Sequence, residues 1–161
     1  MKVIFLDIDG VLVTRNFLFR ELEHGRTGGD TSGFHLFDPI CVDALRKVID
    51  ATGAEIVLSS TWKMFGMPII AKLWSDRKMP GKVFEFTPSK ATRGTEIDEW
   101  LRTSKSRGID VDSFVIIDDE VFDLMTTHSE RVVKTTFDNG LMDKLADDAI
   151  RILNTKIEDK D

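Results

Sequence analysis

Five short apolar runs rich in β-branched residues alternate with amphipathic stretches along the chain, and this alternation limits the folds open to it. The apolar runs lie at residues 3–6, 55–58, 82–86, 113–117 and 131–135. Helical patterns lie at residues 38–52, 67–75, 93–104, 121–129 and 140–154. Strands that alternate with helices predict a parallel sheet covered by helices. We therefore expect an α/β, doubly wound, Rossmann-like three-layer sandwich with a parallel five-stranded sheet.

The length of the chain fits one domain. Its 161 residues are 42% hydrophobic, which is enough for a sizeable core. We expect this domain to span residues 1–155, followed by a charged tail at 156–161. The glycine-rich stretch at 13–37 is expected to form a flap or loop within the domain rather than a linker.

The amino-terminal segment and the single cysteine bear on the compartment. One lysine and a four-residue apolar run precede Asp7, which is too short for a signal peptide, and no apolar stretch approaches the ~20 residues that a membrane span needs. Cys41 has no partner for an internal disulfide and is expected to be a buried small hydrophobe. These features predict a cytoplasmic protein without a membrane partner. They leave the oligomeric state open.

Charge is distributed unevenly along the chain. The net charge of −6 argues against a general nucleic-acid coat, but residues 63–107 carry 10 basic and 5 acidic side chains. Such a segment is either a solvated helix face or a surface that meets a polyanion.

The sequence VIFLDIDGVL, at residues 3–12, ends an apolar strand with two carboxylates, Asp7 and Asp9. The carboxyl ends of parallel strands line the ligand crevice, and Gly10 lets the chain turn away. Close carboxylates repel each other and need a cation or a shared proton. A calcium loop is excluded because Val11 and Leu18 stand where its pattern requires ligands.

A second acidic cluster follows the apolar run at 113–117. Asp118, Asp119 and Asp123 lie there, and in a doubly wound sheet this strand end can be the neighbour of the first. Together the two strand ends predict an oxygen-lined pocket for Mg²⁺. The alternative is that Asp118 and Asp119 cap a helix at 121–129. The combination with Asp7 and Asp9 favours the metal site.

Hydroxyl and basic side chains supply a candidate phosphate site. Ser59 and Ser60 end the run at 55–58, where hydroxyls and backbone N–H groups can bind a phosphate oxygen or cap the next helix. Lys90 and Arg93 lie at the start of the helix at 93–104, where either can neutralise a phosphate or simply face solvent.

In their order and their places at strand ends, DIDGVL, VLSS, a basic residue at a helix start and VIIDDEVFD resemble the four motifs of the haloacid dehalogenase (HAD) superfamily of phosphohydrolases. The segments RGTEIDEWL, FVIIDD and NGL are similar to the HAD domains of RNA-repair polyproteins and of small phage or bacterial phosphatases. The gaps in which the superfamily carries its caps are short here. The resemblance therefore implies no cap or a minimal one.

The resemblance also implies roles for the residues. Asp7 would attack phosphorus to form an aspartyl-phosphate, and Asp9 would protonate the leaving oxygen and then activate water. It implies that Mg²⁺ is held by Asp7, the Asp9 carbonyl and Asp119, with Asp118 or Asp123 assisting. It implies phosphate ligands drawn from Ser59, Ser60, Lys90 and Arg93. An acid at position 9 favours phosphoryl transfer over carbon–halogen cleavage.

The expected function is that of a Mg²⁺-dependent phosphomonoesterase. A capless site suits a phosphate carried by something large, and the basic segment favours a nucleic-acid 3′-phosphate end. A 5′-nucleotidase or small-metabolite phosphatase is the alternative within the same chemistry. A non-catalytic module that binds phosphate or a partner is the alternative of another class. Intact Asp7 and Asp9 argue against the last.

Overall fold

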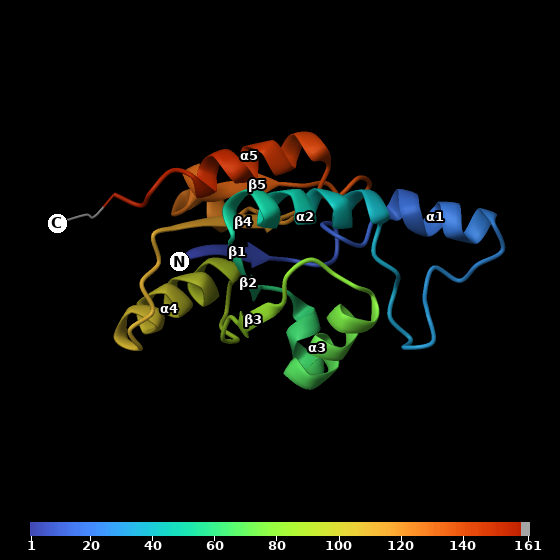
Figure 1. Cartoon of the computed structure of the whole chain (residues 1–161), viewed down its shortest axis with the longest axis horizontal. Helices are drawn as coiled ribbons and strands as arrows, with labels where there is room; N and C mark the ends of the chain where they lie inside the picture. The colour runs from blue at the N-terminus through green and yellow to red at the C-terminus, as the bar shows by residue number, and fades with distance from the viewer. Residues whose placement is uncertain (159–161) are drawn as a thin grey trace.

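The computed structural model describes residues 1–158, and its centre is a parallel sheet (Figure 1). The strands are β1 (Lys2–Leu6), β2 (Glu55–Leu58), β3 (Val83–Phe86), β4 (Ser113–Asp118) and β5 (Val132–Lys134). They pair in the order β3-β2-β1-β4-β5, which confirms the predicted five-stranded parallel sheet. The chain builds outward from β1 in both directions, so the strand order reverses between β1 and β4. In open α/β sheets such a switch point opens the ligand crevice at the carboxyl ends of the strands.

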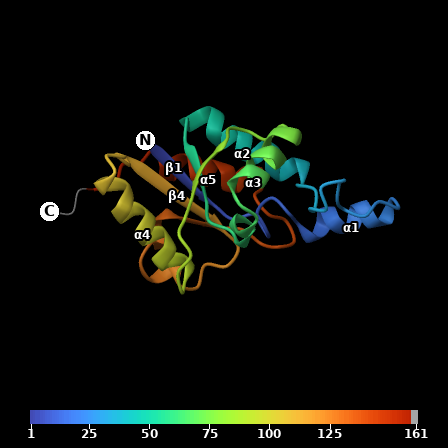
Figure 2. The ribbon, with the colours of Figure 1, turned by 90° about the horizontal axis from the view of Figure 1, so that it is seen from below.

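Helices cover both faces of the sheet and complete the predicted three layers (Figures 1 and 2). On one side lie α2 (Pro39–Thr52) and α5 (Asp143–Leu153), and on the other lies α4 (Arg93–Ser106). Side chains of β1 alternate between the two resulting cores, as strand geometry requires. Leu6 joins the core that contains residues of α2 and α5, whereas Phe5 meets Trp100 of α4 edge-on at 5.4 Å. The remaining long helix, α3 (Met67–Asp76), contacts β3.

The segment at 13–37, expected to be a flap or loop, contains a helix that the sequence pattern did not indicate. Helix α1 (Arg15–Glu23) begins after Thr14, whose hydroxyl accepts a hydrogen bond from the Phe17 amide at 3.2 Å. Both ribbon views show α1 projecting from one end of the molecule (Figures 1 and 2). Phe19 is 56% exposed, and few apolar side chains of α1 face a core. The amphipathic signal that reveals a helix in a sequence is therefore weak here.

The predicted helix at 121–129 is wrong. Two short 3₁₀ turns, η2 (Leu124–Thr126) and η3 (Ser129–Arg131), stand in its place. Leu124 is buried, but Phe122 is 96% exposed, so the segment has no continuous apolar face that would support a helix. Asp118 and Asp119 are consequently not the caps of a helix at this point.

The single cysteine lies in the core, as predicted. Cys41 is buried, its Sγ donates to the Asn139 carbonyl at 3.4 Å, and burial raises its thiol pKa to about 12, as befits a small hydrophobe.

In the expected tail at 156–161, the Ile157 amide donates to the Asp112 carbonyl, while residues 159–161 lie outside the described part. Across residues 1–158, no helix has the length and apolar character to cross a membrane.

Candidate active site

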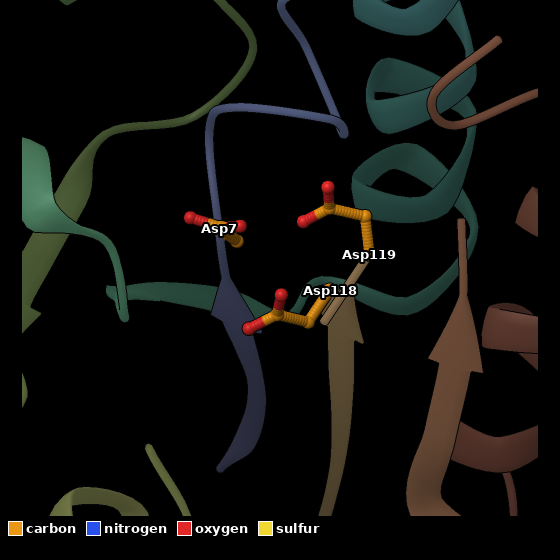
Figure 3. Close-up of side chains that lie close together, drawn as sticks. All are labelled: Asp7, Asp118 and Asp119. Atoms are coloured by element: carbon orange, nitrogen blue, oxygen red, sulfur yellow. The ribbon is translucent and has the colours of Figure 1, made fainter. Parts of the chain in front are cut away.

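Two strand ends bring three carboxylates together, as the sequence predicted. Strands β1 and β4 pair in parallel, and the Asp7 amide donates to the Ile117 carbonyl at 3.1 Å, which sets Asp7 beside Asp118. Carboxylate oxygens of Asp7, Asp118 and Asp119 lie within 4.8 Å of one another. Figure 3 shows the three side chains gathered around one space at the ends of these strands. This cluster is the centre of the candidate site.

The three carboxylates are close together and largely buried, so their charged forms are unfavourable unless a cation binds. Asp7 is 6% exposed and Asp118 is 1% exposed. Burial, reinforced by the neighbouring Asp118 charge, raises the pKa of Asp7 to about 9. Burial also raises the pKa of Asp118 to about 6, although the nearby Arg93 charge opposes the rise. The two carboxyls therefore retain a proton between them near neutral pH unless a further positive charge enters.

The donor set fits a hard divalent cation. Three carboxylates supply oxygen ligands of the kind that Mg²⁺ prefers. Gly10 lies directly against the Asp119 carboxylate, because a Cβ at this position would lie 2.2 Å from Asp119 Oδ2. Its φ of +78° also favours glycine. The turn after β1 thus presses its backbone against the Asp119 carboxylate. Asp7, Asp118 and Asp119 can together hold a metal ion.

The structure separates the two candidate serines. Ser59 follows β2, its amide donates to the Leu6 carbonyl at 2.8 Å, and its Oγ accepts from Arg93 Nη1 at 3.4 Å. Ser60 points elsewhere, because its Oγ accepts from the Trp62 amide at 3.2 Å and so caps the 3₁₀ turn η1 (Thr61–Phe65). Of the two hydroxyls, Ser59 is the one beside the acidic cluster.

The structure also distinguishes between the two candidate basic residues, Lys90 and Arg93. Arg93, the first residue of α4, places Nη1 3.6 Å from both Asp7 Oδ1 and Asp118 Oδ2. Lys90 is exposed, and its backbone amide donates to Glu96 Oε1 at 3.0 Å. The structure therefore brings Arg93, and not the Lys90 side chain, to the carboxylates.

Asp123, also predicted as a metal ligand, is not among the three carboxylates that cluster within 4.8 Å of one another, and it has a hydrogen-bond partner of its own. Its Oδ2 accepts a hydrogen bond from the Gly94 amide at 2.7 Å. That amide belongs to the first turn of α4, where unpaired N–H groups and the helix dipole favour a carboxylate. Asp123 thus fixes the start of the helix that carries Arg93.

Asp9 has a partner that the sequence did not reveal. Its Oδ2 accepts a hydrogen bond from the indole Nε1 of Trp62 at 3.0 Å. The Trp62 side chain is itself buried. The sequence feature that could have indicated this contact is the position of Trp62, two residues after Ser60 and so close to the end of β2. The next residue, Lys63, forms a mostly buried ion pair with Glu96 at 2.9 Å, which connects η1 to α4.

The basic segment at 63–107 is largely neutralised by its own surroundings. Its pairs include Lys72 with Asp76, Arg77 with Asp30, Arg102 with Glu99 and Arg107 with Glu85. Lys82 directly precedes β3 and so lies at the amino edge of the sheet, opposite the acidic cluster. Lys63, Lys90 and Arg93 are the basic residues that line a hollow of about 200 Å³ beside Ser60. Much of the segment is therefore a solvated, paired surface.

Comparison with known families places the chain. Residues 3–146 match the sequence model of the HAD domain in Swiss Army Knife RNA repair proteins. The matched range contains the acidic cluster, Ser59, Arg93 and the Asp9–Trp62 pair. Comparisons with curated proteins and with solved structures give no match. Since the match covers most of the chain, the protein belongs to the family of HAD domains found in Swiss Army Knife RNA repair proteins.

Proposed function

We propose that the protein is a Mg²⁺-dependent phosphomonoesterase that works through an aspartyl-phosphate on Asp7, with a nucleic-acid 3′-phosphate end as its favoured substrate. The observation that carries the proposal is the convergence of one guanidinium on two buried carboxylates. Arg93 Nη1 lies 3.6 Å from Asp7 Oδ1 and from Asp118 Oδ2. A purely structural ion pair would leave no reason for a third carboxylate, Asp119, in the same cluster.

Asp7 is the proposed nucleophile. Its carboxylate oxygen forms a bond to phosphorus while the bond from phosphorus to the substrate's leaving oxygen breaks, which divides one difficult displacement into two easier ones. Arg93 and the Ser59 hydroxyl bind oxygens of the transferring group, because they lie together at the same strand ends. Donors fixed before the reaction stabilise the charge that develops on those oxygens.

Asp9 is the proposed acid and base. In the first step it gives a proton to the leaving oxygen, so the product departs as an alcohol. In the second step it takes a proton from water, whose oxygen attacks the phosphorus of the aspartyl-phosphate. The bond between phosphorus and Asp7 then breaks, inorganic phosphate is released, and both carboxyls return to their starting states. Such proton transfer typically contributes 10²–10⁴-fold to the rate.

Asp7, Asp118 and Asp119 are the residues that would hold Mg²⁺. When bound, the ion supplies positive charge that offsets the repulsion between a carboxylate nucleophile and a phosphate dianion. The raised pKa of Asp7 in the protein alone supports this requirement, since a protonated Asp7 is a poor nucleophile.

Two features support a nucleotide-bearing substrate. The family to which the chain belongs is described by its occurrence in RNA repair proteins. The hollow beside Arg93 adjoins a second one of about 520 Å³, because both are lined by Thr61, Lys63 and Glu96. The second hollow is also bordered by the apolar side chains of Met64 and Phe86. Basic and apolar walls next to the phosphate ligands suit a sugar and a base attached to the phosphate.

The test is phosphate release, with Mg²⁺ and with EDTA, from 3′-phosphorylated and 5′-phosphorylated oligonucleotides, mononucleotides and sugar phosphates. We expect Mg²⁺-dependent release concentrated on 3′-phosphate ends, and none from Asp7→Asn. Release concentrated on mononucleotides or sugar phosphates would replace the substrate assignment with a 5′-nucleotidase or a small-metabolite phosphatase. Folded protein that releases nothing from any substrate would contradict phosphatase activity and favour a non-catalytic binding module.

A further inference from the structure

We propose that Trp62 is a positioning residue for the proton transfer carried out by Asp9, an inference that rests on the proposed phosphatase function. The indole N–H of Trp62 donates to Asp9 Oδ2 at 3.0 Å. An indole N–H can only donate, so it fixes one carboxylate oxygen as an acceptor. The other oxygen, Oδ1, is thereby left as the one to carry and deliver the proton.

The tryptophan is itself firmly held. Its ring centroid lies 5.1 Å from that of Phe34 and 5.8 Å from that of Phe37, and Phe65 packs edge-on against it at 6.4 Å. Its backbone amide donates to Ser60 Oγ, which fixes the start of η1. A buried ring held by packing on its faces and by its backbone has little freedom to turn. The indole N–H therefore has a fixed position and holds the carboxylate of Asp9, a residue that is only partly buried, in one orientation.

This arrangement joins three separate segments at the proton-transferring group. Asp9 belongs to the turn after β1, Trp62 to η1 after β2, and Phe34 to the returning part of the 13–37 segment. Arg77 secures that returning part, because its guanidinium donates to the Phe34 carbonyl at 3.1 Å and pairs with Asp30 at 2.8 Å. The 13–37 segment thus supports the proposed acid through Trp62.

A positioning role can be distinguished from a merely structural one by the leaving group. Benzyl phosphate releases an alkoxide that must be protonated as it departs, whereas 4-nitrophenyl phosphate releases a phenolate that departs without help. The value of kcat/KM reports the step in which the leaving group departs. Misplacing Asp9 therefore lowers kcat/KM for benzyl phosphate and spares that for 4-nitrophenyl phosphate.

Two substitutions separate the hydrogen bond from the packing. Trp62→Phe keeps an aromatic ring but removes the donor. Trp62→His removes the larger ring, but its imidazole matches the five-membered ring of indole and can present an N–H at the position of Nε1. Trp74→Phe is the matched control, because Trp74 is equally buried in the same aromatic group and its indole donates to the Pro80 carbonyl at 3.1 Å, away from Asp9.

We expect Trp62→Phe to lower kcat/KM for benzyl phosphate about 10–100-fold, a part of the contribution made by an acid, and to leave 4-nitrophenyl phosphate within about 2-fold. Trp62→His should be the less stable protein yet retain more activity on benzyl phosphate, while Trp74→Phe should leave the ratio of the two substrates unchanged. In an Asp9→Asn background, Trp62→Phe should cause no further loss, because the two residues act as one unit.

Three results would overturn the positioning role. They are equal losses of kcat/KM on both substrates in Trp62→Phe, a further loss when Trp62→Phe is added to Asp9→Asn, and a gain of activity in Trp62→Phe. Should Trp62→Phe fail to fold, the ¹H chemical shift of the Trp62 indole N–H decides, since loss of the carboxylate in Asp9→Asn is expected to move this shift upfield and an unchanged shift contradicts the proposal. If the wild-type protein with Mg²⁺ releases phosphate from neither of these substrates and from none of the oligonucleotides, mononucleotides and sugar phosphates named above, the proposed phosphatase function fails and this inference falls with it. Wild-type turnover that depends on Asp7, combined with an unchanged substrate ratio in Trp62→Phe, overturns the inference about Trp62 alone.

Discussion

Arg93 Nη1 lies 3.6 Å from Asp7 Oδ1, so the first residue of α4 reaches the end of β1. The same nitrogen is 3.4 Å from Ser59 Oγ at the end of β2. One guanidinium therefore connects the proposed nucleophile with the proposed phosphate hydroxyl. Lys90, which the sequence offered for the same role, is exposed and makes its bond to Glu96 through its backbone.

Removing the Arg93 guanidinium should strongly reduce the rate of phosphomonoester hydrolysis. We predict that Arg93→Ala lowers kcat/KM about 10²–10³-fold, the range found when one donor to developing charge is deleted. Lys90→Ala should change kcat/KM by less than about 3-fold, because an exposed charge contributes little. Steady-state kinetics on one phosphomonoester checks both variants. The reverse order of effects would show that Lys90 swings into the site.

The close approach of Gly10 to Asp119 should make this glycine irreplaceable for metal binding. A Cβ there would lie 2.2 Å from Asp119 Oδ2, so Gly10→Ala should displace that carboxylate and abolish Mg²⁺ binding measured by calorimetry. Gly53→Ala is the control, because Gly53 also has a positive φ (+66°) but open space for a Cβ among residues 1–158. It should cost about 1 kcal/mol of stability from backbone strain and leave Mg²⁺ binding intact. Equal Mg²⁺ affinity in the two variants contradicts the proposed ligand role of Asp119.

The crowded carboxylates predict that the metal-free protein gains stability when Asp7 is neutralised. The pKa of Asp7 in the folded protein is raised to about 9, above its usual value, so the fold favours the protonated form. Stability from this preference is complete below about pH 4 and is lost as the pH rises through about 9. Asn mimics the protonated carboxyl at every pH.

In EDTA, Asp7→Asn should therefore melt close to wild type at low pH and increasingly above it from pH 5 to pH 9. Each kcal/mol gained corresponds to a rise in Tm of about 2–4 °C for a chain of this size. Added Mg²⁺ should narrow or reverse the difference, because the wild-type cluster binds the ion better. A Tm difference that does not change with pH would contradict the raised pKa.

Asp123 and Asp119 should differ sharply when each is removed. Asp123→Ala deletes the 2.7 Å bond to the Gly94 amide, so it should cost about 1 kcal/mol of stability and reduce kcat through the loosened start of α4. Its Mg²⁺ affinity should stay near that of wild type. Asp119→Ala should lose Mg²⁺ affinity instead. Loss of Mg²⁺ affinity in Asp123→Ala would restore Asp123 to the metal ligands.

The parts of the site that the sequence predicted are those set by regular structure. Apolar runs identified β1 and β4, and the rule that parallel strands present their carboxyl ends at one edge brought Asp7 and Asp118 together. Helix α4 was also recognisable from its apolar face, which carries Ile97 and Trp100 into the core. These features follow from local periodicity and a general rule of topology.

The parts that the sequence did not predict depend on how irregular segments pack. Whether Lys90 or Arg93 reaches the site depends on the path of the chain before α4, which no periodicity describes. The Asp9–Trp62 bond joins two turns that are remote in sequence. The spacing at 121–129 imitates a helix, but exposure of Phe122 leaves that helix without a face to bury. Tertiary packing decided each of these points.

The most direct test of the proposed chemistry is mass spectrometry of Asp9→Asn protein quenched in acid during turnover of 4-nitrophenyl phosphate with Mg²⁺. Without Asp9 to activate water, the covalent intermediate should accumulate. The peptide containing Asp7 should gain the mass of one phosphoryl group, and Asp7→Asn should show no such gain. Release of 4-nitrophenol with Asp7 unmodified, or a phosphoryl group on another residue, would contradict it.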